Sequence, residues 1–527
     1  MSQGPVVQIQ AGTSLRGKQV YAKEPKRPVN AFLGIRYGEA PIGQLRFKPP
    51  KPAGIWQGER DATQFGPAAS QNIKNTQAGS RPFRVMSETS EDCLFLNVWT
   101  PNMNPNAKLP VLFWIHGGAF VEGTGQIYHG TAICNYQDVV VISINYRLGA
   151  MGFFTTGDAV APGNLGFLDQ IEALKWTHRH IHKFGGDTSN ITISGESAGA
   201  MSVGFLIMSP LAKGLFKRAI SQSGTVTYPK DAYTYQEITR IIDRKLKRLG
   251  FKGQTSQEKL DFLSGMSAKH INTKVSLFFG PPVIDGTFLP DSPSNLYKQD
   301  RYNKVDYIIG FNSHEGFLVT RMVYAGLGIE FKLDDRATFK QYLRRLVLHN
   351  YRNNQDKITD AIMEEYVGDF DFRDSERATQ LFSDIYGDMI FISPSLAVAK
   401  AHSACCDTYI YMYDHRLRVS PKPEWIKADH GEELVLVFGE PHQTSFPQYF
   451  TEEEQSLSHT FMSYWANFAK SGNPNGSGLP KWPKFNKSEE YMNINTNPQS
   501  KRKYNATRMA FWTDTIGQLE NGHFSKY

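Results

Sequence analysis

Short runs of consecutive apolar residues recur through the first half of the chain and alternate with a segment of helical periodicity. Residues 111–115 and 138–144 are nearly all apolar and rich in β-branched side chains, as expected of strands buried on both faces of a parallel sheet. Residues 164–184 place apolar side chains at helical spacing, and the turn at 185–187 predicts where that helix ends. This alternation predicts an α/β protein with a mostly parallel central sheet and helices on both faces.

The second half repeats the strand signal less often. Residues 307–310 and 408–413 are predicted strands, and residues 230–400 form a more polar, helix-rich stretch that we interpret as insertions over the sheet. A chain of 527 residues exceeds the usual size of a single core. The sequence has no internal repeat and no long linker, so we expect one elaborated domain over residues 1–527.

A serine lies between two of these predicted elements. Gly195-Glu196-Ser197-Ala198-Gly199 follows the strand-like residues 190–194 and precedes the helix-like residues 200–208. A sharp strand-to-helix turn exposes such a serine hydroxyl, and the helix N-terminus favours negative charge beside it. The pattern also fits an ordinary turn with a helix cap. A catalytic role for the serine therefore requires that the chain also supply a base, an acid and oxyanion donors.

A glycine pair offers hydrogen-bond donors for a reaction at that serine. His116-Gly117-Gly118-Ala119 directly follows the predicted strand 111–115. Two glycines allow backbone N–H groups to point into a site, as in an oxyanion hole. Together with the N–H of Ala198, those of Gly117 and Gly118 are candidate oxyanion donors. The alternative is a plain turn that ends the strand.

Candidates for a base and an acid follow later in the chain. His430 lies in a loop before an apolar run, and Glu315 follows the predicted strand 307–310. Each residue type is more often structural or solvated when taken alone. The chain order of serine, acid and histidine is the order of the α/β-hydrolase fold, and this agreement favours Ser197, Glu315 and His430 as a catalytic triad.

Longer motifs carry a family resemblance over nearly the whole chain. They are Ala31-Phe32-Leu33-Gly34-Ile35-Arg36-Tyr37, Ser90-Glu91-Asp92-Cys93-Leu94-Phe95-Leu96-Asn97, Asn145-Tyr146-Arg147-Leu148-Gly149, Ser221-Gln222-Ser223-Gly224 and Tyr464-Trp465-Ala466-Asn467-Phe468-Ala469. With these motifs the chain resembles the type-B carboxylesterases of the cholinesterase–carboxylesterase family. The resemblance implies an α/β-hydrolase fold with helical insertions over the active site, and a serine carboxylesterase that uses no cofactor and no metal.

The same resemblance assigns roles to individual residues. It implies Ser197 as the nucleophile with Glu315 and His430, and the oxyanion donors named above. It also implies two ion pairs, Arg46–Glu91 and Arg147–Asp169, which we interpret as structural. Ser223 is implied as a hydrogen-bond partner of the acid.

Two departures from the family pattern bear on substrate and compartment. Residues 65–71 contain no cysteine, so Cys93 lacks the upstream partner that secreted members have. Cholinesterases carry a tryptophan about ten residues before this cysteine, which stacks on a quaternary ammonium. The nearest counterpart in this chain is Phe83, next to Arg84, and this combination disfavours choline esters. Phe278 is a candidate for the acyl pocket, with ordinary core packing as the alternative.

Cysteine use favours a reducing compartment. The chain has four cysteines, of which the adjacent Cys405 and Cys406 are not expected to bridge each other easily. We therefore expect a cytoplasmic protein, since no signal peptide or transmembrane segment is evident. Sequons at Asn190, Asn475, Asn486 and Asn505 support the alternative of a secretory protein whose leader has been removed.

Charge and composition restrict the partners. The net charge of +7 is dispersed, and no basic run interleaves with aromatic residues, so nucleic acid is not an expected partner. The expected partner is a small-molecule ester, and the oligomeric state stays open. Two other functions remain: a non-catalytic adhesion or scaffold protein, which typically lacks a triad residue, and a lipase, which needs an exposed apolar lid.

Overall fold

The chain folds into two compact units. The computed structural model describes residues 4–24, 27–72, 88–226, 232–275, 282–326, 332–443 and 449–521. Unit 1 comprises Met1–Ile220, Ala232–Asp306 and Leu434–Leu479, and unit 2 comprises Ser221–Asp231, Tyr307–Glu433 and Pro480–Tyr527. The interpretation of residues 1–527 as one domain stays a prediction.

Unit 1 is built around a mixed sheet with a parallel centre. Its strand order is β11-β9-β10-β8-β4-β3, formed by β3 (Lys18–Tyr21), β4 (Pro28–Arg36), β8 (Phe95–Thr100), β9 (Leu109–Ile115), β10 (Val140–Ile144) and β11 (Gly186–Glu196). Strand β9 is parallel to both β10 and β11, whereas β8, β4 and β3 add on in antiparallel order. The side chains of Val111, Phe113 and Ile115 lie on one face of β9 and those of Leu112 and Trp114 on the other, and all five are buried, as a sheet covered on both faces requires.

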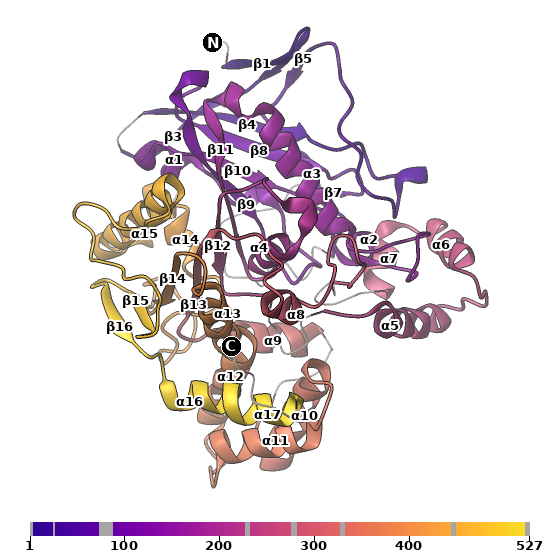
Figure 1. Ribbon diagram of the computed structural model, residues 1–527, viewed down its shortest axis with the longest axis vertical. Helices are drawn as coiled ribbons and strands as arrows, with labels where there is room; N and C mark the ends of the chain where they lie inside the picture. Colours follow the sequence, from indigo (N-terminus) through magenta and orange to yellow (C-terminus); the bar gives the residue numbers. More distant parts are fainter. Residues whose placement is uncertain are drawn as a thin grey trace. The chain divides into compact units, whose positions relative to one another are not determined.

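Helices cover both faces of this sheet (Figure 1). Helices α1 (Thr131–Gln137) and α15 (Glu452–Ser471) pack together on one face, and α3 (Leu165–His180) and α4 (Ala198–Met208) pack together on the other. The remaining helices of unit 1 are α2 (Gly149–Phe153), α5 (Tyr235–Arg248), α6 (Ser256–Ser264), α7 (Ala268–Lys274), α8 (Pro293–Lys298) and α14 (Leu434–Val437). A smaller sheet has the order β1-β2-β5, from β1 (Val6–Gln10), β2 (Thr13–Arg16) and β5 (Gly58–Asp61).

Unit 2 has its own run of strands. Parallel pairing joins β13 (Asp306–Asn312) to β14 (Thr408–Tyr413) and β14 to β15 (Glu490–Ile494), and β16 (Gln499–Arg502) closes the edge in antiparallel order. Strand β12 (Arg218–Gln222) carries the chain from unit 1 into unit 2. The helices of unit 2 are α9 (Gly316–Gly326), α10 (Arg336–Asn350), α11 (Gln355–Ile362), α12 (Ser375–Gly387), α13 (Ser393–His402), α16 (Ala506–Ala510) and α17 (Gly517–Asn521).

The predicted strands and helices are confirmed, with shifts at their ends. Residues 408–413 coincide with β14, and residues 111–115 fall inside β9. The helix predicted over 164–184 begins at Leu165, and its last turn is a 3₁₀-helix that ends at Gly185, whose φ is 80°. Among the described residues between α5 and α13, β13 is the one named strand and the other named elements are helical, in agreement with the helix-rich interpretation of residues 230–400.

Two arginine–carboxylate pairs stabilise unit 1, as the resemblance implied. The Arg147 Nη2 lies 2.7 Å from Asp169 Oδ1, and the Nε and backbone N–H of Arg147 also donate to this buried carboxylate. The Arg46 guanidinium contacts both carboxylate oxygens of Glu91, with Nε at 2.7 Å. Such bidentate pairs fix two segments in one geometry.

Within the part of the chain that the structure describes, one run of helix meets the length and hydropathy of a membrane span. It extends from Ser375 to His402, with a mean hydropathy of 1.2, and 78% of its most apolar window is buried inside the protein. Burial of this degree is what a helix in a protein core shows.

Candidate active site

Ser197 occupies the turn between β11 and α4. Its backbone has φ 56° and ψ −123°, a conformation that costs a non-glycine residue on the order of 1–3 kcal/mol. The preceding Glu196 is buried, whereas Ser197 is partly exposed. The turn therefore holds the hydroxyl at the end of a central strand, as the sequence predicted.

The two glycines of this turn are needed because backbone segments approach closely there. A Cβ on Gly195 would lie 2.5 Å from the carbonyl carbon of Gly199. A Cβ on Gly199 would overlap the carbonyl oxygen of Ile115 at the end of β9. The strand–turn–helix unit closes only because neither position carries a side chain.

The loop after β9 lies against this turn. A Cβ on Gly117 would come within 2.6 Å of Glu196 Oε2 and 3.0 Å of Ser197 Cβ. Gly118 has φ 108°, and its carbonyl accepts hydrogen bonds from the N–H groups of Val121 and Glu122. Within the part of the chain that the structure describes, the N–H groups of Gly117, Gly118 and Ala198 donate to no other group. These three donors remain available to a ligand.

His116 supports the loop from inside the protein. Its ring is fully buried, stacks on Tyr146 at 4.5 Å, and its Nδ1 lies 2.8 Å from the Gly117 carbonyl oxygen. The Tyr146 hydroxyl donates to the His116 carbonyl oxygen at 2.9 Å. Burial lowers the pKa of His116 to about 4. The imidazole is therefore neutral at pH 7.

Glu122 places a carboxyl group on the same loop. Its Cγ lies 3.1 Å from where a Cβ on Gly118 would be. Burial raises the pKa of Glu122 to about 7. The loop beyond it is anchored by Gln71, whose side-chain amide accepts from the N–H and donates to the carbonyl oxygen of Gly123, both at 2.8 Å.

In unit 2, the predicted acid and base form a buried pair. The Nδ1 of His430 lies 2.6 Å from Oε2 of Glu315, and Glu315 is 1% exposed. A carboxylate only accepts hydrogen bonds, so Nδ1 carries the proton and Nε2 is the basic nitrogen. Phe391 packs on the imidazole with ring centroids 4.6 Å apart. The pair matches the orienting half of a Ser–His–acid triad.

The second oxygen of the acid is held by the backbone. Oε1 of Glu315 accepts the N–H of Asn312 at 2.6 Å, at the end of β13. The side-chain amide of Asn312 donates to the carbonyl oxygen of Asp429 and to Glu433, both at 2.7 Å. Glu433 is a second buried carboxyl, which also accepts from Gln222 at 2.9 Å. Burial, together with the charge of Glu315, raises the pKa of Glu433.

A charged cluster fixes the loop that carries the base. Oδ1 of Asp429 accepts the backbone N–H of His430 at 2.7 Å. Its Oδ2 lies 2.7 Å from Nζ of Lys422, which is also 2.9 Å from Glu432. Burial raises the pKa of Asp429 to about 6, against the opposing effect of the Lys422 charge. The backbone N–H of His430 is therefore held by a carboxylate that Lys422 in turn fixes.

Three further predictions for the site have different outcomes. Ser223 is buried, but its Oγ has no hydrogen-bond partner in the described part of the chain, so the expected bond to Glu315 is wrong. The N–H of Ser223 donates instead to the Gly310 carbonyl oxygen at 2.8 Å. Phe83 and Phe278 lie outside the described residues.

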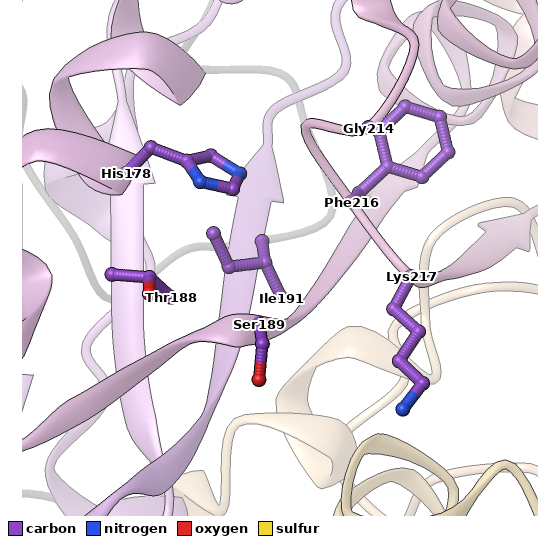
Figure 2. A pocket seen from close by; sticks show the side chains of 7 residues that line it. All are labelled: His178, Thr188, Ser189, Ile191, Gly214, Phe216 and Lys217. Carbon is purple, nitrogen blue, oxygen red and sulfur yellow. The ribbon is translucent and has the colours of Figure 1, made fainter.

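A separate pocket of about 470 Å³ opens on unit 1 (Figure 2). It is lined by His178, Thr188, Ser189, Ile191, Gly214, Phe216 and Lys217. The His178 Nε2 donates to the carbonyl oxygen of Leu215 at 2.8 Å, and the Lys217 side chain extends away from this ring. None of the residues predicted for catalysis lines this pocket.

Sequence reasoning missed several residues that support the site. They are Glu122, His116, Asn312, Lys422, Asp429 and Glu433. Asp429 and Glu433 adjoin His430 in sequence, which was the available signal, whereas the contact of Asn312 with Glu433 spans 121 residues. Among the described residues, no group of three or more His, Cys, Asp or Glu side chains is arranged to hold a metal ion.

Comparison with known proteins gives one consistent result. A family model described as the Carboxylesterase family matches residues 3–512. The chain is 38% identical to a liver carboxylesterase of Sus scrofa, over 98% of this chain and 93% of that protein. It is 37% identical to a medium-chain fatty acyl-CoA hydrolase precursor of Anas platyrhynchos, with the same coverage. It is also 37% identical to carboxylesterase 5A of Canis lupus familiaris, over 95% of this chain and 88% of that protein.

Proposed function

The chain belongs to the carboxylesterase family and is a carboxylic ester hydrolase, and we propose that it works through an acyl-enzyme on Ser197. In this proposal Glu315 and His430 complete the triad, and the N–H groups of Gly117, Gly118 and Ala198 form the oxyanion hole. The observation that carries it is the buried hydrogen bond of 2.6 Å between His430 and Glu315. It commits the imidazole to the tautomer that a general base needs.

In the first step, Nε2 of His430 removes the hydroxyl proton of Ser197 as the oxygen attacks the ester carbonyl. Negative charge then develops on the former carbonyl oxygen. The three N–H donors stabilise this charge, each worth on the order of 10²–10³-fold in rate. His430 gives its proton to the departing alcohol, and the acyl group stays on Ser197 as an ester.

In the second step, water takes the place of the alcohol. His430 removes a proton from the water, whose oxygen attacks the acyl-enzyme carbonyl. The tetrahedral intermediate collapses, the carboxylic acid leaves, and the proton returns to Ser197. Glu315 stabilises the imidazolium that forms in each step and is not itself protonated.

For the substrate, we propose small, uncharged carboxylic esters rather than choline esters. The support is Phe83 beside Arg84, the nearest counterpart in this sequence of the tryptophan that cholinesterases carry. A phenylalanine ring attracts a quaternary ammonium less strongly, and a neighbouring arginine repels it.

Hydrolysis of a p-nitrophenyl acyl series, with acetylthiocholine alongside, tests both parts of the proposal. We expect turnover of short acyl esters, little turnover of acetylthiocholine, and no turnover by Ser197→Ala. A fluorophosphonate probe should label wild-type protein stoichiometrically and leave Ser197→Ala unlabelled. Turnover retained by Ser197→Ala would contradict the assignment of the nucleophile.

The same measurements separate the alternative functions. A folded wild-type protein without turnover and without labelling points to an adhesion or scaffold protein. Activity that rises sharply only with emulsified esters points to a lipase. A preference for acetylthiocholine would contradict the substrate proposal alone and leave the triad intact.

We also propose a cytoplasmic location. Cys93 and Cys134 are buried thiols that form no disulfide, as is usual for proteins of reducing compartments. Treatment of the protein from its native source with an N-glycosidase should leave its electrophoretic mobility unchanged. A shift in mobility would place the chain in the secretory pathway.

A further inference from the structure

Two adjacent cysteines are presented at the surface of unit 2, in the turn between α13 and β14. The backbone N–H groups of Cys405 and Cys406 both donate to the carbonyl oxygen of His402, each at 3.2 Å. The Thr408 hydroxyl donates to the carbonyl oxygen of Cys406 at 3.1 Å. Both cysteines are therefore fixed in a hydrogen-bonded turn at the end of a helix.

The two sulfur atoms of this pair lie next to each other. Sγ of Cys405 lies 2.8 Å from Sγ of Cys406, and no disulfide joins them. Cys405 is exposed and Cys406 is half-buried, so reagents in solution reach the pair. A hydrogen-bonded turn that brings two thiols together removes most of the entropy cost of binding one atom between them.

The other two cysteines provide a contrast within the same chain. Cys93 and Cys134 are completely buried, and burial raises the pKa of both thiols far above its ordinary value. Thiols in such surroundings are inert because the thiolate is the reactive form. Reaction with a thiol reagent is therefore directed to Cys405 and Cys406.

Backbone geometry favours the dithiol form of the pair over its disulfide. Consecutive Cα atoms are about 3.8 Å apart across a trans peptide bond. Disulfides usually need a Cα separation of roughly 4.4–6.8 Å. A disulfide between neighbours is therefore strained and easily reduced. An atom inserted between the two sulfurs enlarges the ring and removes this strain.

We propose that Cys405 and Cys406 form a chelating site for trivalent arsenic compounds. Soft thiolate ligands select soft, thiophilic centres of this kind. With phenylarsine oxide, each thiol gives up its proton and forms one As–S bond, and the oxide oxygen leaves with both protons as water. Arsenic stays trivalent throughout, so the step needs no oxidant or reductant.

Mass spectrometry of the reduced full-length protein tests the proposal. Phenylarsine oxide should add one phenylarsenic group per chain. The adduct should persist in excess 2-mercaptoethanol and be removed by 2,3-dimercaptopropanol, because only a dithiol competes with a chelate. Cys405→Ser and Cys406→Ser should each lose the adduct in 2-mercaptoethanol, whereas Cys134→Ala should keep it.

Turnover of a p-nitrophenyl ester by every variant reports correct folding, since neither surface cysteine belongs to the proposed catalytic residues. Three results overturn the proposal. The first is a reduced wild-type protein that forms no adduct. The second is a wild-type adduct removed by 2-mercaptoethanol. The third is a single-serine variant that holds the adduct as firmly as wild type.

Discussion

Glu315 and His430 are separated by 115 residues of sequence, and a hydrogen bond of 2.6 Å joins them inside unit 2. The carboxylate fixes both the orientation and the tautomer of the imidazole. Glu315→Gln keeps the size of the side chain but replaces one oxygen by an amide nitrogen, which cannot accept the Nδ1 proton. We expect kcat to fall by about 10³–10⁴-fold with little change in KM.

Steady-state hydrolysis of a p-nitrophenyl ester measures this effect. The matched control is Glu365→Gln, a change at an exposed glutamate of unit 2, which should leave kcat unchanged. A Glu315→Gln enzyme within tenfold of wild type would show that Glu315 does not orient the base.

The backbone of Ser197 is expected to store strain that can be measured. At φ 56° and ψ −123°, only glycine has an unstrained backbone. Ser197→Gly relieves the strain and Ser197→Ala keeps it, although both remove the nucleophile. After allowing for the greater unfolded-state freedom of glycine, we expect Ser197→Gly to be more stable than Ser197→Ala by on the order of 1 kcal/mol. Equilibrium urea unfolding compares the two, and equal midpoints would mean that the turn is relaxed.

Gly199 is expected to tolerate no side chain. A Cβ there overlaps the carbonyl oxygen of Ile115, so Gly199→Ala must push β9 and α4 apart. We expect a loss of about 2–3 kcal/mol in the free energy of unfolding. Gly54→Ala serves as the control, because its Cβ would meet nothing within 4 Å. If both variants unfold at the same urea concentration, the close approach is not what requires glycine.

Ionisation of the Glu122 carboxyl group is expected to lower the free energy of unfolding as pH rises. Burial raises its pKa from 4.5 to about 7 in the folded protein. The folded state therefore binds more protons than the unfolded state between these two values, and its advantage is lost as pH rises through about 7. Relative to Glu122→Gln, wild type should lose unfolding free energy over this range.

Measuring the difference between the two proteins is essential because His116 titrates nearby with the opposite sign. Its lowered pKa of about 4 makes stability rise with pH in the acidic part of the same range. The variant retains His116, so the difference isolates Glu122. A difference in unfolding free energy that stays constant from pH 4.5 to pH 8 would rule out a raised pKa.

Lys422 is expected to matter for both stability and turnover. Lys422→Met leaves the buried Asp429 and Glu432 without their cation, which should cost about 3 kcal/mol of unfolding free energy. Because Asp429 also holds the backbone N–H of His430, we expect kcat to fall as well. Lys427→Met removes an exposed lysine from the same loop and should change stability by less than about 1 kcal/mol. Similar losses in the two variants would contradict a specific role of Lys422.

The sequence allowed the central elements and the catalytic candidates to be predicted because their signals are local. Residues 111–115 are apolar on both faces, and the Gly185 turn has a backbone requirement of its own. The cluster around His430 was not predictable in this way. Lys422, Asp429 and Asn312 meet only when β13 and the loop before His430 are folded, and no periodicity records such contacts.

Other differences between prediction and structure have the same physical origin. Ser223 was expected to form a hydrogen bond to the acid. Its N–H instead donates to the Gly310 carbonyl oxygen, and its Oγ has no hydrogen-bond partner among the described residues. No prediction was made for Glu122, because only the fold of the loop buries its carboxyl group. Burial and side-chain direction depend on contacts that are distant in sequence.

Ser197 and Gly117 stand at the ends of β11 and β9, which are neighbours in parallel register. Because the two strands are hydrogen-bonded neighbours, a displacement of the sheet moves both ends together. It therefore largely cancels in the separation of the proposed nucleophile from the proposed oxyanion donors. The separation of Ser197 from Gly117, which an attacking oxygen and a developing charge would both require, is thus little changed by collective motions of the sheet.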